Sequence, residues 1–260
     1  MKVLILISFG LAIIFLVGCS GSKDVIVTAH RGASGLAPEN TLSSFKAAIK
    51  NNADFSELDA QETADGVIIV LHDKDLKRTS GSDGNIWELN YGELKNYEVG
   101  SWFEKKFDGE KVPTLQEVIN LVKGKMKLNI ELKMNGHEKV LAEKVVKIIE
   151  ENDFIDQCIV TSFNFDEIKT VRRLNKNIKV GYIFSKMPDD IDIFKADCDL
   201  LSVNKKLVDE EFVKKAHENG KEVHVWTVNE PDEMKKLITL GVESLITNYP
   251  NKLNEILDSK

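Results

Sequence analysis

From residue 24 to the end of the chain, short apolar runs rich in β-branched residues alternate with amphipathic stretches, and this alternation is the feature that most constrains the fold. The apolar runs predict eight strands, at Val25–Ala29, Asp54–Ala60, Lys127–Leu132, Gln157–Ser162, Lys179–Phe184, Asp199–Val203, Glu222–Val228 and Glu243–Thr247. Helical patterns follow them at Asn40–Asn52, Thr114–Val122, Glu138–Glu151, Phe165–Leu174, Asp189–Lys195, Asp209–Glu218, Asp232–Leu240 and Lys252–Leu257. Repeated strand–helix units give a parallel sheet. Eight of them in 260 residues predict an α/β fold of the closed (β/α)8 TIM-barrel type, for which about 250 residues is typical.

An open, doubly wound sheet is the alternative arrangement of such units. That fold usually carries a Gly-rich phosphate loop after its first strand, and no such loop follows Ala29. The barrel is therefore favoured, and residues 19–260 are expected to form one domain.

Residues 61–112 interrupt the alternation, because they separate the second strand from the next helix by far more than an ordinary βα loop. Ala64-Asp65-Gly66 is a hairpin signal, and the apolar run up to His72 is typical of a strand that runs back. The remainder holds Trp87 and Trp102 among glycines and charged residues. We expect a compact insertion after strand 2 that caps the barrel mouth, meaning the end of the barrel where the strands finish.

Residues 1–18 differ from the rest of the chain. Met1-Lys2 precedes an apolar run that is shorter than the about 20 residues needed to span a bilayer and has the form of a secretory signal. Its end, Leu16-Val17-Gly18-Cys19, resembles a bacterial lipobox, in which cleavage precedes a cysteine that receives a diacylglyceryl group. We expect a lipoprotein signal peptide over residues 1–18, lipidation of Cys19, and export to the outer face of the bacterial cytoplasmic membrane or the periplasmic side of a membrane. A signal anchor with an incidental cysteine is the alternative.

The net charge of −7, without a basic stripe, argues against nucleic acid as a partner, since nucleic-acid binding depends on neutralising phosphates. A small phosphate-bearing substrate stays compatible with this charge. Cys158 and Cys198 begin apolar runs on strands that are not neighbours in the predicted barrel, so we expect both to be buried free thiols. The sequence does not indicate an oligomeric state.

Charged residues gather at the ends of the predicted strands, where TIM barrels carry their functional groups. Side chains alternate across a strand, so Glu57 and Asp59 share one face and Glu131 and Lys133 share another. If both faces look into the mouth, three carboxylates converge beside one lysine and require a cation. Oxygen ligands suit Mg²⁺ or Ca²⁺ better than zinc. Salt bridges on the barrel exterior are the alternative for each pair taken alone.

Two histidines follow apolar runs at the same end of the predicted barrel. His30 comes after the first strand and His72 after the returning strand of the insertion. Imidazole titrates near neutral pH and can act as a base or an acid. Arg31 offers a planar fork for phosphate oxygens, and Lys133 a point charge for the same group. The other histidines, at positions 137, 217 and 224, are expected to be structural.

These residues belong to an ordered series of short motifs. The series is His30-Arg31-Gly32, Pro38-Glu39-Asn40-Thr41, Glu57-Leu58-Asp59, Asp65-Gly66, His72-Asp73, Pro113-Thr114-Leu115, Glu131-Leu132-Lys133, Ser162-Phe163 and Trp226-Thr227-Val228-Asn229. In this order, over residues 28–250, the motifs resemble the signature of the glycerophosphodiester phosphodiesterase family, here as a bacterial lipoprotein member. The last strand motif departs from the family, whose members often have aspartates where this chain has Glu243 and Asn248.

The resemblance implies a barrel with a capping insertion and the hydrolysis of glycerophosphodiesters to an alcohol and sn-glycerol 3-phosphate. It also implies a divalent metal at Glu57, Asp59 and Glu131, and acid–base catalysis by His30 and His72. Neither the resemblance nor the residues assign the two histidines to acid and base, or the nucleophile to water or the neighbouring glycerol hydroxyl.

Phe163 and Trp226 are candidates for an apolar wall against the substrate, with core packing as the alternative. Two other functions are compatible with the sequence. A phospholipase of the D or C type would act on intact lysolipids or inositol lipids, and the predicted metal triad favours the D type. A tethered lipoprotein would bind glycerophosphodiesters without cleaving them, although no expected histidine or carboxylate is missing.

Overall fold

A computed structural model describes residues 25–259 as a closed parallel barrel. Its eight strands are β1 (Ile26–Ala29), β2 (Phe55–Glu62), β4 (Lys127–Leu132), β5 (Cys158–Ser162), β6 (Lys179–Phe184), β7 (Leu200–Asn204), β8 (Glu222–Trp226) and β9 (Ser244–Thr247). Each strand pairs in parallel with its neighbours, and β1 pairs with both β9 and β2, which closes the ring. The predicted (β/α)8 fold is confirmed.

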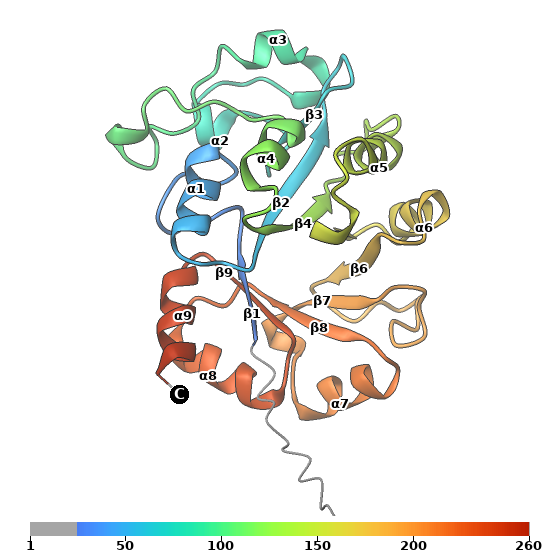
Figure 1. The fold of residues 1–260 in the computed structure, drawn as a ribbon. Coiled ribbons are helices and arrows are strands. Elements are labelled where there is room, and N and C mark those ends of the chain that lie inside the picture. The colour runs from blue at the N-terminus through green and yellow to red at the C-terminus, as the bar shows by residue number, and fades with distance from the viewer. Residues whose placement is uncertain (1–24, 260) are drawn as a thin grey trace, which may run out of the picture.

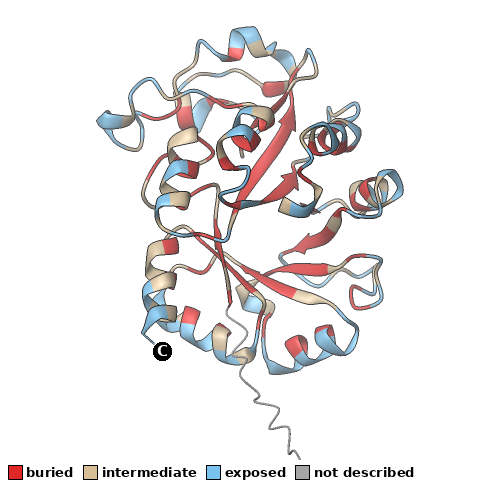
Figure 2. Ribbon diagram, viewed as in Figure 1, coloured by how far each residue is buried: buried red, intermediate tan, exposed pale blue. Residues whose placement is uncertain are grey.

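The outer layer consists of helices between the strands, coloured along the chain in Figure 1. They are α1 (Leu42–Lys50), α4 (Leu115–Val122), α5 (Leu141–Glu151), α6 (Phe165–Leu174), α7 (Glu210–Glu218), α8 (Pro231–Leu240) and α9 (Pro250–Asp258). Local sequence explains several starts: Thr41 and Thr114 form capping boxes with Ser44 and Glu117, and α8 and α9 begin at a proline. Each helix buries one face on the barrel and exposes the other (Figure 2).

The predicted helix at Asp189–Lys195 is wrong. Between β6 and β7 the chain forms bends and a turn instead. Aspartates and β-branched isoleucines are poor helix formers, and Ile193 and Phe194 are nonetheless buried against the barrel. The segment thus buries its apolar side chains without forming a helix, and the barrel lacks an outer helix at this position.

The insertion after β2 has its own small apolar core. The chain reverses at Gly66 into β3 (Ile68–Val70), which pairs antiparallel with the end of β2 as predicted. It then forms α2 (Lys77–Ser80), α3 (Tyr91–Leu94) and 3-10 turns at Ile86–Glu88 and Lys105–Phe107. Seven buried side chains form this core: Ile69, Leu71, Leu76, Ile86, Leu94, Val99 and Val112. Further 3-10 turns lie at Ile155–Gln157 and Lys205–Leu207.

Both thiols within the described residues are free and buried, as predicted. Cys158 begins β5 and Cys198 precedes β7, so β6 separates them. Burial raises the pKa of Cys158 to about 12, which leaves an unreactive thiol. Among residues 25–259, no helix has the length and apolar character to cross a membrane. Cys19 and the predicted signal peptide lie outside the described residues.

Candidate active site

The mouth of the barrel holds a cavity of about 110 Å³ in which most of the predicted site residues meet. His30 follows β1, Glu57 lies on β2, and Glu131 lies on β4. The lining residues are His30, Arg31, Glu57, His72, Asn129, Glu131, Lys133, Thr161, Phe163, Ile183, Ser202, Trp226 and Ile246. Asp59 does not line the cavity but contacts two residues that do, Arg31 and Lys133.

A tight turn between β1 and α1 positions Arg31. Arg31 has a left-handed φ of 53°, an uncommon conformation for a side chain of this size. Gly32 follows with a φ of 75°, and a Cβ there would lie 2.2 Å from Ser44 Oγ, so only glycine fits. The Arg31 amide donates to Glu57 Oε2 at 2.9 Å, which fixes the turn to β2.

Three buried carboxylates form the floor of the site. Glu57, Asp59 and Glu131 each offer an oxygen, and these oxygens lie within 4.8 Å of one another. Asp59 and Glu131 occupy paired positions on β2 and β4. Because side chains alternate along a strand, Glu57 and Asp59 face the same way, as the sequence predicts.

The three carboxyl groups differ in pKa. Burial and the charges of Asp59 and Glu131 raise the pKa of Glu57 well above its usual range. Burial, with Asp59 beside it, raises the pKa of Glu131 to about 7. The pKa of Asp59 falls to about 2 despite burial, because Arg31 and Lys133 stabilise its charge. Burial and the crowding of three carboxylates therefore disfavour full ionisation of the site in the absence of an added cation.

The donor set fits a divalent metal ion. It consists only of carboxylate oxygens, the ligands that Mg²⁺ and Ca²⁺ prefer. Asp59 Oδ1 is buried and accepts no hydrogen bond, and its one charged neighbour among the described residues is Lys133 Nζ at 3.3 Å, so this oxygen keeps capacity to bind a cation. A bound cation would also relieve the repulsion that raises the pKa of Glu57 and Glu131.

Two cationic side chains flank the carboxylates. Arg31 Nη1 donates to Glu39 Oε1 at 2.9 Å, and Arg31 Nε lies 3.4 Å from Asp59 Oδ2. Lys133 Nζ lies 2.8 Å from Glu131 Oε1 and 3.3 Å from Asp59 Oδ1. Both cations line the cavity, so each can reach an anionic group placed over the carboxylates.

The two predicted histidines both line the cavity. His30 Nδ1 lies 2.7 Å from Asn248 Oδ1, and His30 Nε2 lies 3.9 Å from Glu57 Oε2. His72 Nδ1 lies 2.7 Å from Asp73 Oδ1. In both rings Nδ1 donates to an oxygen, which leaves Nε2 as the free atom.

Burial lowers the pKa of both imidazoles. Desolvation, with the charge of Arg31, lowers the pKa of His30 to about 4. Desolvation also lowers the pKa of His72, and Arg31 and Lys133 add to the effect, while Asp59 and Asp73 oppose it. The two rings differ in their partners, since Asn248 is neutral and Asp73 is charged.

Phe163 and Trp226 form one wall of the cavity. Their ring centroids are 5.8 Å apart at an interplanar angle of 76°. Phe163 is 45% exposed, more than core packing would leave. This geometry favours the predicted apolar wall over simple packing.

Several motif residues of this region have contacts that the sequence does not predict. Glu39 and Asp73 accept hydrogen bonds from Arg31 and His72, and Asn40 donates to Asp59 at 2.8 Å. Asn248, noted as a departure, contacts His30. Arg78, from α2 of the insertion, carries no sequence signal for the site, because only the fold brings it near the mouth.

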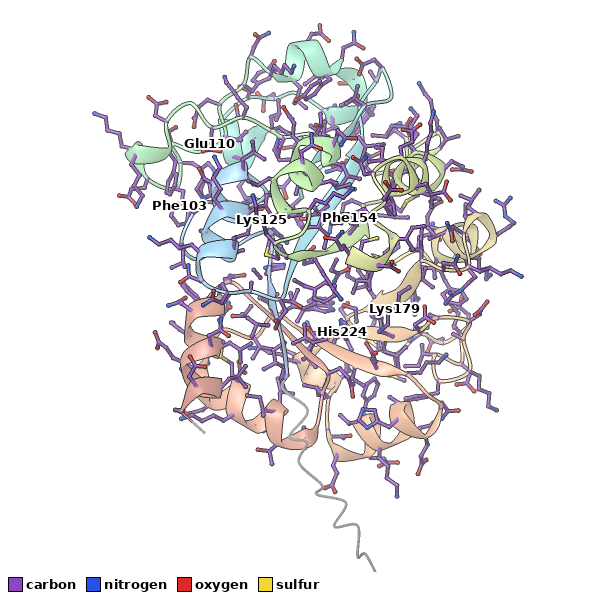
Figure 3. All side chains as sticks on the ribbon, viewed as in Figure 1. Phe103, Glu110, Lys125, Phe154, Lys179 and His224 are labelled. Carbon is purple, nitrogen blue, oxygen red and sulfur yellow. The ribbon has the colours of Figure 1, made fainter. Side chains whose placement is uncertain are left out.

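The three other histidines do not line the cavity. His137 stacks on Trp87, with ring centroids 4.2 Å apart, and His217 pairs with Glu243. His224 is buried in the barrel and lies 3.2 Å from Glu222, which also contacts Lys179. Figure 3 labels His224 and Lys179 on the barrel strands, far from the insertion residue Phe103. The interpretation of these histidines as structural agrees with their positions.

Residues 30–252 match the model of the glycerophosphoryl diester phosphodiesterase family. A glycerophosphodiester phosphodiesterase of Caldanaerobacter subterraneus subsp. tengcongensis is 34% identical over 241 residues, which cover 88% of this chain and 96% of the relative. One from Bacillus subtilis is 31% identical over 256 residues, 90% of this chain and 87% of the relative. The solved structure of an Oleispira antarctica phosphodiesterase in complex with the product sn-glycerol 3-phosphate matches with a TM-score of 0.83 and 31% identity, over 89% of this chain and 96% of that one. The chain belongs to the glycerophosphoryl diester phosphodiesterase family.

Proposed function

We propose that the protein hydrolyses glycerophosphodiesters to an alcohol and sn-glycerol 3-phosphate, using a divalent metal ion and acid–base catalysis by His30 and His72. One observation carries the proposal: three buried carboxylates lie within 4.8 Å of one another, and two of them line a single cavity together with two imidazoles and two cationic side chains. The names of the relatives and the product bound in the Oleispira structure support the substrate class.

The phosphate would lie over the carboxylates, between Arg31 and Lys133. The Arg31 guanidinium can donate two hydrogen bonds to phosphate oxygens, and the Lys133 ammonium adds a point charge. Bound by Glu57, Asp59 and Glu131, Mg²⁺ or Ca²⁺ would supply positive charge that neutralises the phosphate and stabilises the transition state. Phe163 and Trp226 would exclude water from one side and contact carbon atoms of the substrate.

Proton transfer falls to the two imidazoles. One removes the proton from the attacking oxygen, which forms the new P–O bond, and the other gives a proton to the alcohol oxygen as its bond to phosphorus breaks. The nucleophile is water or the neighbouring glycerol hydroxyl; in the second case a cyclic phosphate forms first and water opens it. His30 and His72 each have a fixed Nδ1 partner, so Nε2 is the atom that moves the proton.

A lysolipid is the second candidate substrate, for a lysophospholipase of the D type. A larger groove of about 1040 Å³ adjoins the catalytic cavity and shares Lys133 and Phe163 with it. It runs along α6 and residues 190–196, where the barrel lacks an outer helix. Met134 and Phe163 expose apolar surface in this groove, to which an acyl chain could bind.

Lipidation of Cys19 and attachment to the outer face of a membrane are part of the proposal. They are supported by the apolar run over residues 3–17 and by the Leu16-Val17-Gly18-Cys19 sequence at its end.

The test is an assay of the purified mature chain on glycerophosphocholine, glycerophosphoethanolamine, glycerophosphoglycerol and lysophosphatidylcholine, each with and without Mg²⁺ or Ca²⁺. We expect metal-dependent release of sn-glycerol 3-phosphate from the first three, at higher kcat/KM than lysophosphatidic acid from the fourth. Faster cleavage of the lysolipid would favour the second candidate. Binding of the diesters without turnover would make the protein a receptor and contradict the proposal.

A further inference from the structure

Arg78 of α2 connects the insertion, through Asp73, to the loop between β1 and α1, through Glu39. Its Nε donates to Asp73 Oδ2 at 2.6 Å. Its Nη1 and Nη2 donate to Glu39 Oε2 and Oε1 at 2.9 and 2.7 Å. All three nitrogens of the guanidinium are therefore engaged by two carboxylates that come from different parts of the chain.

Asp73 connects Arg78 to a proposed catalytic imidazole. Its Oδ2 accepts from Arg78, and its Oδ1 lies 2.7 Å from His72 Nδ1. With one oxygen held by the guanidinium, the carboxylate can turn little, so the other oxygen fixes the ring orientation and the Nδ1–H tautomer of His72. The free Nε2 then keeps one direction relative to the cavity.

Glu39 connects Arg78 to the proposed phosphate-binding arginine. Its Oε1 accepts from both Arg78 Nη2 and Arg31 Nη1. Glu39 is thereby held between two guanidinium groups, and Arg31 is oriented toward Asp59 and the cavity. Without Arg78, the carboxylate of Glu39 would keep only Arg31 as a charged partner among the described residues and could draw that side chain away from the phosphate.

We propose that Arg78 is a positioning residue that holds His72 through Asp73 and Arg31 through Glu39, so that the insertion and the barrel present one aligned site. This inference rests on the proposed function for the roles of His72 and Arg31. Arg78 itself does not line the catalytic cavity.

The chemistry of the bridge requires arginine. A lysine ammonium is a point charge. It cannot form, in one fixed geometry, both the contact that Nε makes with Asp73 and the bidentate contact with Glu39. Loss of the guanidinium would leave Glu39 and Asp73 without the cation that they share, and their repulsion would disturb the positions of Arg31 and His72, which they contact. The Trp102 ring centroid lies 5.9 Å from the Arg78 guanidinium carbon, and this cation–π contact within the insertion supports the position of Arg78.

The test compares Arg78→Gln and Arg78→Lys with a matched control, Lys77→Gln. Lys77 lies in the same helix, but its ion pair is with the exposed Asp83. We expect Arg78→Gln to lower kcat on the order of 10- to 100-fold, as small misplacements of catalytic groups do, and to raise KM for glycerophosphocholine. Arg78→Lys should not restore kcat, and Lys77→Gln should retain wild-type kcat and KM.

A double-mutant cycle separates positioning from general support of the fold. If Arg78 acts through His72, Arg78→Gln should reduce kcat much less in a His72→Gln background than in the wild type. Effects that multiply, full activity in Arg78→Gln, or full rescue by Arg78→Lys would each overturn the inference.

The ring signals of His72 can be measured without turnover, so they test the role of Arg78 independently of the proposed function. In protein labelled with ¹⁵N-histidine, the ring signals of His72, assigned with His72→Gln, should report a protonated Nδ1 in the wild type and in Lys77→Gln. Arg78→Gln should shift this signal or replace it by a mixture of tautomers. An unchanged His72 signal in Arg78→Gln would contradict the positioning role, whereas a wild type that cleaves no glycerophosphodiester would contradict only the proposed function.

Discussion

At the scale of single residues, the crowded carboxylates make a prediction about pH. In the metal-free site Glu131 has a pKa of about 7 and Glu57 a pKa well above its usual range, first because both are buried. A protonated carboxyl is a poor ligand, so protons and the metal compete. We expect divalent-ion affinity to rise as pH increases through the pKa of Glu131, about 7, and to level off only where Glu57 is ionised as well. Calorimetric titration with Mg²⁺ and Ca²⁺ across this range checks it, and a constant affinity would contradict it.

The two histidines make a second prediction. His30→Gln and His72→Gln should each lower kcat by about 10²–10⁴-fold while substrate still binds, because Arg31, Lys133 and the carboxylate site remain. A substrate with a better leaving group should partly rescue the variant that lost the general acid and should not rescue the other. His217→Gln, which changes an ion pair outside the cavity, is the control. Near-wild-type turnover in either active-site variant would end the acid–base proposal for that residue.

How far the site could be predicted from sequence depends on the kind of contact. Glu57, Asp59 and Glu131 could be placed together because strand periodicity gives their direction and the barrel gives their common end. The contacts of Glu39, Asn40 and Asn248 depend on the exact path of loops. Loop sequences lack the periodic pattern that gives side-chain direction in a strand. Arg78 comes from an insertion whose packing only tertiary structure decides.

At the scale of elements, the strands could be predicted because each is a buried run bounded by turns. The helix expected at Asp189–Lys195 could not be excluded, because its apolar spacing suits a helix or a series of turns, and packing of Ile193 and Phe194 selects the turns. The hairpin at Gly66 could be predicted from its turn sequence, but the small core beyond it could not.

The small apolar core of the insertion can be tested for its effect on stability and kcat. Leu94→Ala within it and Leu253→Ala in α9 both remove a fully buried side chain, so each should lower the free energy of unfolding by about 2–5 kcal/mol. Only Leu94→Ala should also lower kcat of the folded protein, because the insertion carries His72 and Arg78. Urea unfolding and kcat, measured where both variants are folded, provide the check. Wild-type kcat in Leu94→Ala would show that the insertion does not position the site.

At the scale of the whole molecule, the direction of β1 relates the proposed lipid anchor to the mouth. The chain enters the barrel at Ile26 and reaches the site only at His30, so Val25 lies at the end opposite the mouth. From Cys19 to Val25 an extended chain reaches about 20 Å at most. A lipid on Cys19 would therefore hold the end of the barrel opposite the mouth near the membrane and turn the mouth toward the solvent.

This orientation predicts soluble diesters as the preferred substrates. Lipidated protein on vesicles and soluble Cys19→Ala protein should cleave glycerophosphocholine at the same rate, and both should cleave bilayer-embedded lysophosphatidylcholine poorly. Membrane extraction and the mass of the protein report lipidation, which Cys19→Ala should abolish. Faster lysolipid cleavage by the anchored form would contradict the orientation.

The central claim is that the carboxylates at the barrel mouth bind a metal ion on which hydrolysis depends. The measurement that tests it is the rate of sn-glycerol 3-phosphate release from glycerophosphocholine, in excess chelator and then during titration with Mg²⁺ or Ca²⁺, for wild-type and Glu131→Gln protein. The wild type should be inactive in chelator and recover with either ion, whereas Glu131→Gln should need more metal and recover to a much lower rate. Full wild-type activity in excess chelator would contradict the claim.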